Sequence, residues 1–427
     1  MNRLTGKGMW VAVVVLVCGV AVAADWPQFG GPGRDNISQE KGLARTWPEG
    51  GPKVLWRVPL GIGFASPSVA DGKVYVLDRP DDQQDVLRCL NLADGKELWN
   101  FTYAAPGTPT HTGSRTAPTI EGKYVYSVGI MGDLYCVDCD THLPVWHKNL
   151  CADFKVAEPM WGVSQAPSIY NDLLIVAPQA PDAYVAAFKK ATGELVWKTE
   201  GLGLLGYTTP VVAKLAGVDQ VIMAGSCNPS GPEKGTVAAF SLKDGSILWR
   251  YENWQNPIPI PFPTALPDDR LFITGGYKGG SAMLQITQKD GKLEAKELFK
   301  TDDSIGSQLQ QPLLIGQCLY MNSNSNDRSD GMECVGLDGQ IKWKTKGTEG
   351  LPNFGFGPIL YADNLIFNLD GDKGILHLIE PSPDGYKELS QAKLLDGKEI
   401  WSPMALTDGK LLIRSQSEMK CLDVRNP

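Results

Sequence analysis

The chain has 427 residues, of which 43% are hydrophobic and 21% are charged, and these values are ordinary for a globular protein with a large core. Its formal net charge of −8 at pH 7 argues against a nucleic-acid partner, which would need a basic surface. The 47 glycines and 30 prolines are spread along the chain, as the many turns of an all-β protein require.

Residues 1–24 predict a signal peptide. Arg3 and Lys7 form a basic start, an apolar stretch covers residues 10–22, and residues 21–23 supply the small side chains of a cleavage site. Two alternatives stay open: an uncleaved membrane anchor, and lipidation at Cys18, although the valine before it stands where a lipobox needs a small residue. We therefore expect an exported protein, periplasmic or secreted, that meets the membrane only through the cleaved segment.

Residues 25–52 show no strand periodicity. They predict an ordered strap that is anchored onto an apolar surface by Trp26, Phe29 and Trp47. The remainder, residues 53–427, is predicted to be a single repeat domain.

One short pattern recurs along this domain. Asp94-Gly95 leads to Trp99, and the same pattern closes at Trp197, Trp249 and Trp343, at a spacing near fifty residues. An Asp-Gly pair between apolar runs favours a two-residue hairpin, because such turns need a positive φ that glycine adopts at little cost. Each copy is therefore predicted as a turn followed by a strand that ends on an aromatic residue.

The first complete unit predicts four short antiparallel strands, at residues 66–69, 74–77, 86–90 and 97–101, with Asp71-Gly72 as the first turn. Four such strands make one blade of a β-propeller. The aromatic marker of the fourth strand recurs at eight positions: Trp56, Trp99, Trp146, Trp197, Trp249, Phe299, Trp343 and, as a degenerate copy, Leu389.

The two ends of the repeat array complement each other. Residues 401–424 predict three strands without a fourth, whereas residues 53–58 resemble a fourth strand without a blade. Pairing the two segments closes a ring and removes an exposed sheet edge. The prediction is an all-β fold, an eight-bladed propeller of four-stranded antiparallel blades, with seven blades as the alternative if residues 356–392 are an insertion.

The metal-binding and redox candidates are weak. A third-strand position is shared by alanine and by Cys89, Cys136, Cys334 and Cys421, which predicts buried structural thiols. Cys139 with Cys151 is the one disulfide pairing that we would name. No histidine pair has ligand spacing, and the acidic, amide-rich loop 322–331 lacks the alternation of a calcium loop, so no metal is predicted.

The best candidate site is the mouth of the propeller channel. The first strand of each blade lines the axis, so the residues at its start surround one mouth. Phe64, Ser66 and Phe356 belong to this funnel of aromatic and amide side chains. The predicted ligand-binding residues within it are Arg115, Trp161, Gln165, Tyr207, Phe262, Gln308, Gln311, Phe354 and Trp401. Such a funnel suits a planar or polar small ligand or a peptide loop, and a guanidinium suits a carboxylate. The alternative is that these side chains only fill the channel.

The repeated D-G-x-x-x-W pattern resembles the tryptophan-docking repeat of pyrroloquinoline-quinone (PQQ) β-propellers, over essentially all of residues 53–424. Within that family, quinoprotein alcohol dehydrogenases hold PQQ and calcium over the ring axis, whereas BamB-like proteins are cofactor-free scaffolds. The opening residues 25–32 are also similar to exported PQQ-like propellers of unassigned function. The resemblance implies that the docking residues are Trp56, Trp99, Trp146, Trp197, Trp249 and Trp343.

The resemblance to BamB-like proteins implies an exported, non-catalytic binding or scaffold module of the cell envelope, without cofactor or metal. The positions at which the dehydrogenases carry a catalytic aspartate and calcium ligands are here filled mainly by Gln, Phe and Tyr. The expected partner is an envelope protein, or a small polar or planar ligand at the mouth, and the expected state is a monomer. Two alternatives remain: a PQQ- and calcium-dependent alcohol or sugar dehydrogenase, and carbohydrate or peptide binding through Trp161, Tyr207 and Trp401.

Overall fold

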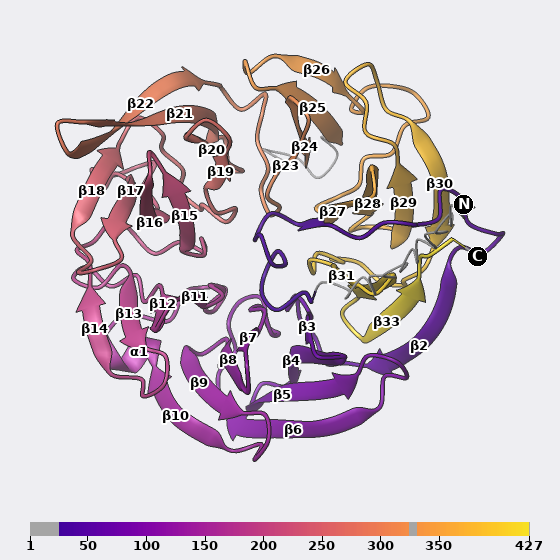
Figure 1. The fold of residues 1–427 in the computed structure, drawn as a ribbon, viewed down its shortest axis with the longest axis horizontal. Coiled ribbons are helices and arrows are strands. Elements are labelled where there is room, and N and C mark those ends of the chain that lie inside the picture. Colours follow the sequence, from indigo (N-terminus) through magenta and orange to yellow (C-terminus); the bar gives the residue numbers. More distant parts are fainter. Residues whose placement is uncertain (1–24, 324–330, 427) are drawn as a thin grey trace, which may run out of the picture.

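The computed structural model describes residues 25–323 and 331–426, and it shows eight sheets arranged around a central axis (Figure 1). The predicted signal peptide and most of the loop 322–331 lie outside the described residues. The eight-bladed all-β prediction is confirmed. The seven-bladed alternative is wrong, because residues 359–393 form a complete four-stranded blade of their own.

In the first four blades the strands follow one another in chain order from the axis outwards. Their bounds are β3 (Ser68–Ala70), β4 (Lys73–Asp81), β5 (Gln84–Asn91) and β6 (Glu97–Ala104); β7 (Thr119–Glu121), β8 (Tyr124–Val128), β9 (Asp133–Asp138) and β10 (Pro144–Asn149); β11 (Ser168–Tyr170), β12 (Leu173–Val176), β13 (Ala186–Lys189) and β14 (Leu195–Lys198); β15 (Val211–Leu215), β16 (Val218–Ala224), β17 (Val237–Ser241) and β18 (Ile247–Tyr251). The one helix in the described ranges is the single turn α1 (Leu150–Asp153), after β10.

The last four blades repeat the pattern, with an extra strand in the seventh and a split eighth. Their bounds are β19 (Thr264–Leu266), β20 (Arg270–Gly275), β21 (Gly280–Lys289) and β22 (Lys292–Lys300); β23 (Leu313–Ile315), β24 (Cys318–Asn322), β25 (Met332–Gly336) and β26 (Ile341–Lys344); β27 (Ile359–Ala362), β28 (Leu365–Leu369), β29 (Ile375–Ile379) and β30 (Glu388–Lys393), with β1 (Ile37–Ser38) beside β27; β31 (Ala405–Thr407), β32 (Lys410–Arg414), β33 (Glu418–Asp423) and β2 (Lys53–Pro59). Among the residues that the structure describes, no helix is long and apolar enough to cross a membrane.

The ring closes as predicted. Strand β2 pairs antiparallel with β33, so the outermost strand of the eighth blade comes from the N-terminal part of the chain and the inner three come from the C-terminal part. This pairing joins segments more than 350 residues apart in sequence, and it gives the eighth blade its fourth strand.

The Asp-Gly turns are of two kinds. Asp71 and Gly72 make the expected two-residue turn between β3 and β4, both with positive φ, 49° and 69°. The two-residue prediction for the repeated turn before the tryptophan is wrong. The loop 92–95 has four residues, because the backbone N–H of Gly95 donates to the carbonyl of Asn91, which itself pairs with Lys96.

Several outer-strand aromatic residues pack on the equivalent turn of the next blade, whereas Trp249 Nε1 donates to Gln220 of its own blade. Trp146 Nε1 donates to the Lys190 carbonyl at 3.0 Å, and Trp197 Nε1 donates to the Leu242 carbonyl at 3.0 Å. Each indole ring rests on the turn glycine, so a Cβ on Gly193 would lie 2.8 Å from the Trp146 ring. The same glycine has a φ of 70°, so both the turn and the contact between blades require it.

A β-bulge precedes this aromatic position in every blade. In β30 the residue skipped by the pairing is Leu389, because Glu388 pairs with Ile379 and Ser390 with Leu378. The degenerate marker expected at Leu389 is therefore wrong by one position, since the residue in register is Ser390. Trp47 of the strap lies there instead, and its backbone N–H donates to Ser390 Oγ at 3.3 Å.

The strap crosses the channel, and Figure 1 shows this indigo segment turning near the centre of the ring and then running outwards to the rim. Trp26 forms a bridge with the first blade, and the carbonyl of Pro27 accepts a hydrogen bond from the second. Arg34 donates to the carbonyl of Pro167 before the third blade, and Asn36 donates to Gln311 before the sixth. Strand β1 then pairs in parallel with the seventh blade. The strap therefore covers the channel interior.

The core lies between neighbouring blades, and the cysteines follow it. Cys89, Cys136, Cys334 and Cys421 are fully buried, as predicted. The suggested disulfide between Cys139 and Cys151 is wrong: all cysteines in the described ranges are free thiols. These two residues pack into different interblade clusters, one against the first and second blades and one against the second and third.

Candidate functional site

A cavity of about 340 Å³ opens at the channel mouth, where the chain enters the innermost strands. It contains six of the nine predicted ligand-binding residues: Arg115, Trp161, Tyr207, Gln308, Gln311 and Trp401. These residues come from segments that precede five different inner strands, since Gln308 and Gln311 both precede β23, so the ring brings together positions spread over almost 300 residues of sequence.

The other three predicted residues lie in the protein interior. Gln165 is 4% exposed, and its Nε2 donates to the carbonyl of Gly206 at 3.1 Å. Phe262 packs edge-on against the ring of Phe29, and Phe354 is fully buried against His377. Proximity to a strand start places a residue near the mouth, but the local backbone decides whether its side chain faces the cavity or the core.

Two pairs of stacked aromatic rings form much of the cavity wall. The rings of Phe64 and Trp401 lie 5.4 Å apart at an interplanar angle of 19°. The rings of Trp161 and Tyr207 lie 4.9 Å apart at 27°, and Tyr277 stacks beyond Trp161 at 6.4 Å. Flat apolar faces therefore border the cavity, and the amides of Gln308, Gln310 and Gln311 line it as well.

Several wall residues were not predicted from the sequence. Phe29 comes from the strap, whose path across the channel has no sequence signal beyond its aromatic anchors. Tyr277 belongs to a turn between β20 and β21 and has a φ of 55°. Because the prediction considered only residues at the start of each first strand, it did not include Tyr277. The remaining additions are His111, Ser164, Thr209, Ile260, Leu309, Gln310 and Pro403.

Arg115 is the sole arginine or lysine among the residues that line the cavity, and none of those residues is an aspartate or glutamate. Its Nη2 donates to the carbonyl of His111, and its guanidinium carbon lies 4.9 Å from the centre of the Phe64 ring. Burial lowers the pKa of Arg115 to about 10, although Tyr207 and Glu399 oppose the shift, so the side chain stays cationic at neutral pH. Within the described ranges, its buried Nε has no hydrogen-bond partner.

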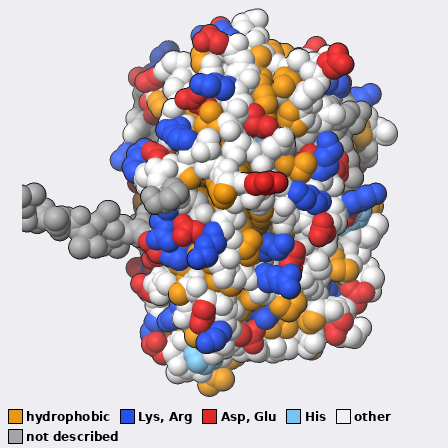
Figure 2. Space-filling model, turned by 90° about the vertical axis from the view of Figure 1, so that its right-hand side faces the viewer, with side chains coloured by type: hydrophobic (Ala, Val, Ile, Leu, Met, Phe, Trp, Pro, Cys, Tyr) orange, Lys and Arg blue, Asp and Glu red, His pale blue; other side chains and the backbone are white. Residues whose placement is uncertain are grey.

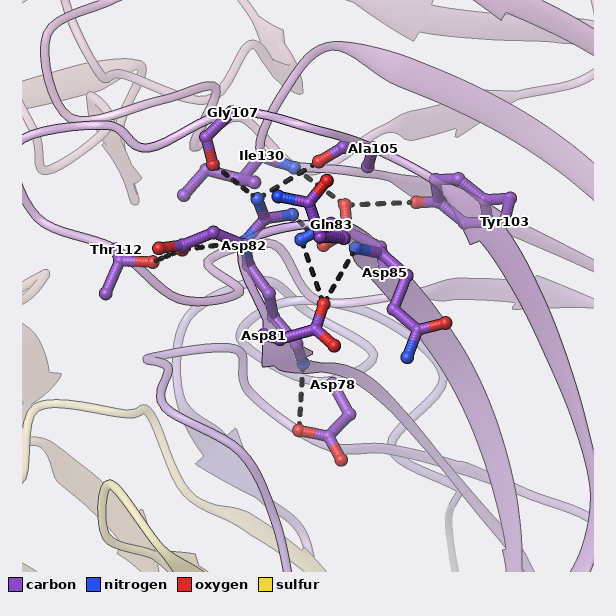
Figure 3. Close-up of polar contacts among 12 residues, drawn as sticks. Asp78, Asp81, Asp82, Gln83, Asp85, Tyr103, Ala105, Gly107, Thr112 and Ile130 are labelled. Carbon is purple, nitrogen blue, oxygen red and sulfur yellow. Dashed lines mark hydrogen bonds and ion pairs between the residues drawn. The ribbon is translucent and has the colours of Figure 1, made fainter.

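A buried ion pair supports the loop that carries Arg115 (Figure 3). Arg79 Nη1 lies 2.7 Å from Asp85 Oδ1, with both side chains buried. Arg79 Nη2 donates to the carbonyls of Ala105 at 3.0 Å and Gly107 at 2.7 Å. Because the pair is desolvated but hydrogen-bonded on several sides, it holds the start of the loop in one position.

The middle of the same loop is also held. Thr112 Oγ1 donates to Asp82 Oδ1 at 2.6 Å, and Asp82 belongs to the turn that follows Arg79. Desolvation raises the pKa of Asp85, and the Arg79 guanidinium opposes that rise. This network does not line the cavity, so its residues position the mouth without contacting a bound group.

Exposed apolar side chains are close in sequence to residues that line the mouth. Ile62, Met160 and Leu204 are 50%, 67% and 42% exposed, and each lies within three residues of a lining residue in sequence. Elsewhere the surface is mixed: Figure 2 shows acidic and basic side chains interspersed over the side of the molecule that it faces.

The residues present do not fit the calcium–quinone pair of the dehydrogenases. Calcium needs several oxygen ligands, commonly carboxylates, and the cavity wall holds no carboxylate. Over residues 25–323 and 331–426, no cluster of three or more His, Cys, Asp or Glu side chains could hold a metal ion.

Eight four-stranded blades with a recurring outer-strand tryptophan define a PQQ-like eight-bladed β-propeller. Residues 82–345 match the family model described as outer membrane protein assembly factor BamB, so the chain belongs to this family. The outer membrane protein assembly factor BamB of Salmonella typhimurium is 21% identical over 404 residues, which cover 90% of this chain and 92% of that protein.

Two solved structures share the fold at low sequence identity. A quinohemoprotein alcohol dehydrogenase, ADHIIG from Pseudomonas putida HK5, superposes with a TM-score of 0.62 at 12% identity, over 95% of this chain and 81% of that one. A europium-containing methanol dehydrogenase superposes with a TM-score of 0.61 at 13% identity, over 91% and 89%. At these identities the likeness concerns the fold alone.

Proposed function

We propose that this protein is an exported, non-catalytic binding module of the cell envelope that holds a segment of a partner protein at its channel mouth. The observation that carries the proposal is the cavity itself: two stacked aromatic pairs, several amides and one arginine, without a carboxylate, beside an apolar rim. Apolar and aromatic surface with a few directed polar groups is typical of recognition sites.

Family membership supports a partner in the envelope, because the sequence relatives are named for outer membrane protein assembly. In the same proposal, residues 1–24 direct export, the mature chain is a periplasmic monomer, and the outer-strand tryptophans are docking residues that keep the ring rigid. A rigid ring can present a preformed mouth, so recognition needs no large movement.

A dehydrogenase function has less support. Quinoprotein chemistry would need ligands for calcium, and the cavity wall offers amides, hydroxyls and one exposed histidine in their place. Titration of the purified mature protein with PQQ, with and without calcium, tests this alternative through quenching of tryptophan fluorescence. Saturable quenching that depends on calcium would favour the dehydrogenase over the binding module.

The proposal predicts a specific contact at the rim. A photo-crosslinking amino acid placed at Met160, which is 67% exposed beside Trp161, should yield one discrete adduct with an envelope protein in living cells. The matched control is the same substitution at Leu298, which is 48% exposed on the outer strand β22 and should yield no such adduct.

Replacing Trp161 with alanine in the Met160 crosslinking variant should remove the adduct, because the aromatic wall would lose a face. Equal labelling from the two positions, or an adduct that is indifferent to Trp161, would contradict binding at the mouth. Mass spectrometry of the adduct identifies the partner and the residue joined.

A further inference from the structure

The mouth contains a cation without an acidic counterpart on the cavity wall. Arg115 donates to the His111 carbonyl with one edge of its guanidinium, and its face lies over Phe64. These contacts fix the direction of the group but leave its charge uncompensated by any lining residue, since none is acidic. Glu399 acts electrostatically on Arg115 and raises its pKa, but it is not part of the wall.

The guanidinium also has capacity left for hydrogen bonding. Its Nε is buried and has no partner in the part of the chain that the structure describes. A buried donor without a partner is costly, and a bound acceptor removes that cost. Arginine matches carboxylates in particular, because its planar fork can present parallel N–H donors to two oxygens.

The surroundings of Arg115 select the rest of the ligand. On one side lies the stacked pair of Phe64 and Trp401, and the stacked rings of Trp161 and Tyr207 form another part of the same wall. Exposed aromatic faces favour a flat or apolar group that can stack on them. Phe29 of the strap adds a further ring, so the cavity as a whole favours a flat group over a strongly hydrated one.

We propose that the mouth binds a carboxylate carried on a flat, apolar group, with Arg115 as its counter-ion and the two stacked aromatic pairs as its walls. This deepens the proposed function, because an acidic side chain or a C-terminal carboxylate beside an aromatic residue would supply this chemistry from a partner protein. A free aromatic carboxylate would supply the same chemistry from a small molecule.

Two matched probes test the charge requirement directly. N-acetyl-tryptophan carries a carboxylate beside an indole ring, and N-acetyl-tryptophanamide is its neutral analogue. Isothermal titration calorimetry of the mature wild-type protein at low salt should show that the carboxylate binds at least about tenfold more tightly, as a charge-assisted bond to a partly buried arginine requires. This comparison needs no variant, so a folding defect cannot obscure it.

Variants then assign the preference to one residue. Arg115→Gln should reduce the preference for the carboxylate to about twofold or less, and Arg115→Lys should restore part of it because the charge returns without the fork. The matched control is Arg250→Gln, an arginine on the outer strand β18 that pairs with Glu200 away from the mouth, and it should keep the full preference.

Three results would overturn the proposal: equal affinity for the two probes, no binding of either probe, or a carboxylate preference that survives in Arg115→Gln. The outcome is separable from that of crosslinking at Met160. Selective probe binding without a protein adduct supports a small-molecule source of the carboxylate and contradicts the partner-binding function. A protein adduct without probe selectivity contradicts the carboxylate anchor alone.

Discussion

Buried charges in this propeller differ in how they are compensated. Arg79 is paired with Asp85 and donates to two carbonyls, so its charge serves the structure. Glu333 on β25 is fully buried with Lys344 Nζ 2.9 Å from its Oε2. Desolvation nevertheless raises the pKa of Glu333 to about 7, because the lysine only partly offsets the loss of water.

Glu333 should therefore make the stability of the protein depend on pH. Between pH 4.5, the ordinary pKa of a glutamate, and about 7, the folded protein holds a proton that the unfolded chain has released. Unfolding then releases a proton, so the free energy of unfolding falls as the pH rises through this window. Across this window the free energy of unfolding of the wild type should fall by up to about 3 kcal/mol relative to that of Glu333→Gln. Each tenfold change in proton affinity is worth about 1.4 kcal/mol.

Urea denaturation of both proteins at several pH values between 4.5 and 8 measures this difference. The control is Glu194→Gln on the surface, where the glutamate pairs with Lys189 and both side chains are more than half exposed, and where little change is expected. A difference between wild type and Glu333→Gln that stays constant with pH would show that Glu333 remains ionised throughout.

At the scale of the element, the repeated unit is a turn and the indole that rests on it from the preceding blade. Trp197 is 6% exposed, it donates to the Leu242 carbonyl, and its ring leaves no room for a Cβ on Gly245. One side chain therefore connects two blades through both packing and a hydrogen bond. Blade-to-blade contacts of this type replace the single central core of smaller domains.

Replacing Trp197 with alanine should lower the free energy of unfolding by about 3 to 5 kcal/mol, the usual cost of removing a large buried aromatic side chain. The matched control is Trp161→Ala at the mouth, where the indole is only partly buried and the loss should be smaller. Chemical denaturation followed by circular dichroism measures both. Equal losses of unfolding free energy in the two variants would indicate that Trp197 stabilises the fold no more than Trp161 does.

At the scale of the whole molecule, the ring closes where β2 pairs with β33. We call this pairing the seam, because no hairpin turn joins its two strands. Strand β2 completes the eighth blade by pairing with β33, and the strap lies beside the end of β33, where Leu43 forms a bridge with Arg425. The ring of Trp47 stacks on Phe367 at 6.5 Å, and its backbone bonds to Ser390, where the seventh blade has no aromatic residue of its own. The strap thus supplies, between the seventh and eighth blades and next to the seam, the packing that the repeat supplies elsewhere.

Trp47→Ala should loosen the seam while the other blades stay intact. Hydrogen exchange of amides in β30 and β33 should accelerate on the order of tenfold, because local opening would cost roughly 1.4 kcal/mol less. Exchange in β13, on the opposite side of the ring, serves as the internal control. A uniform change over all blades, or none at the seam, would contradict a local role for Trp47.

Much of the mouth could be predicted because inner strands converge on the axis of any propeller. Arg115, Trp161 and Trp401 were found by position alone, without knowledge of their contacts. Gln165 and Phe354 could not be separated from them, because the direction of a side chain depends on one or two backbone dihedrals, such as the positive φ of 60° at Phe354. Phe29 could not be assigned, because nothing local specifies where a strap docks.

The sequence by itself determined the repeat and the closure of the ring and predicted eight blades with seven as the alternative, because hydrophobic alternation and turn residues recur at a fixed period and act locally. Only the tertiary structure decided that the strap crosses the channel, that Trp47 lies beside Ser390 where the seventh blade lacks an outer-strand aromatic residue, and that Arg115 faces a cavity wall without an acid. Those features depend on contacts between residues hundreds of positions apart, and no local pattern encodes them.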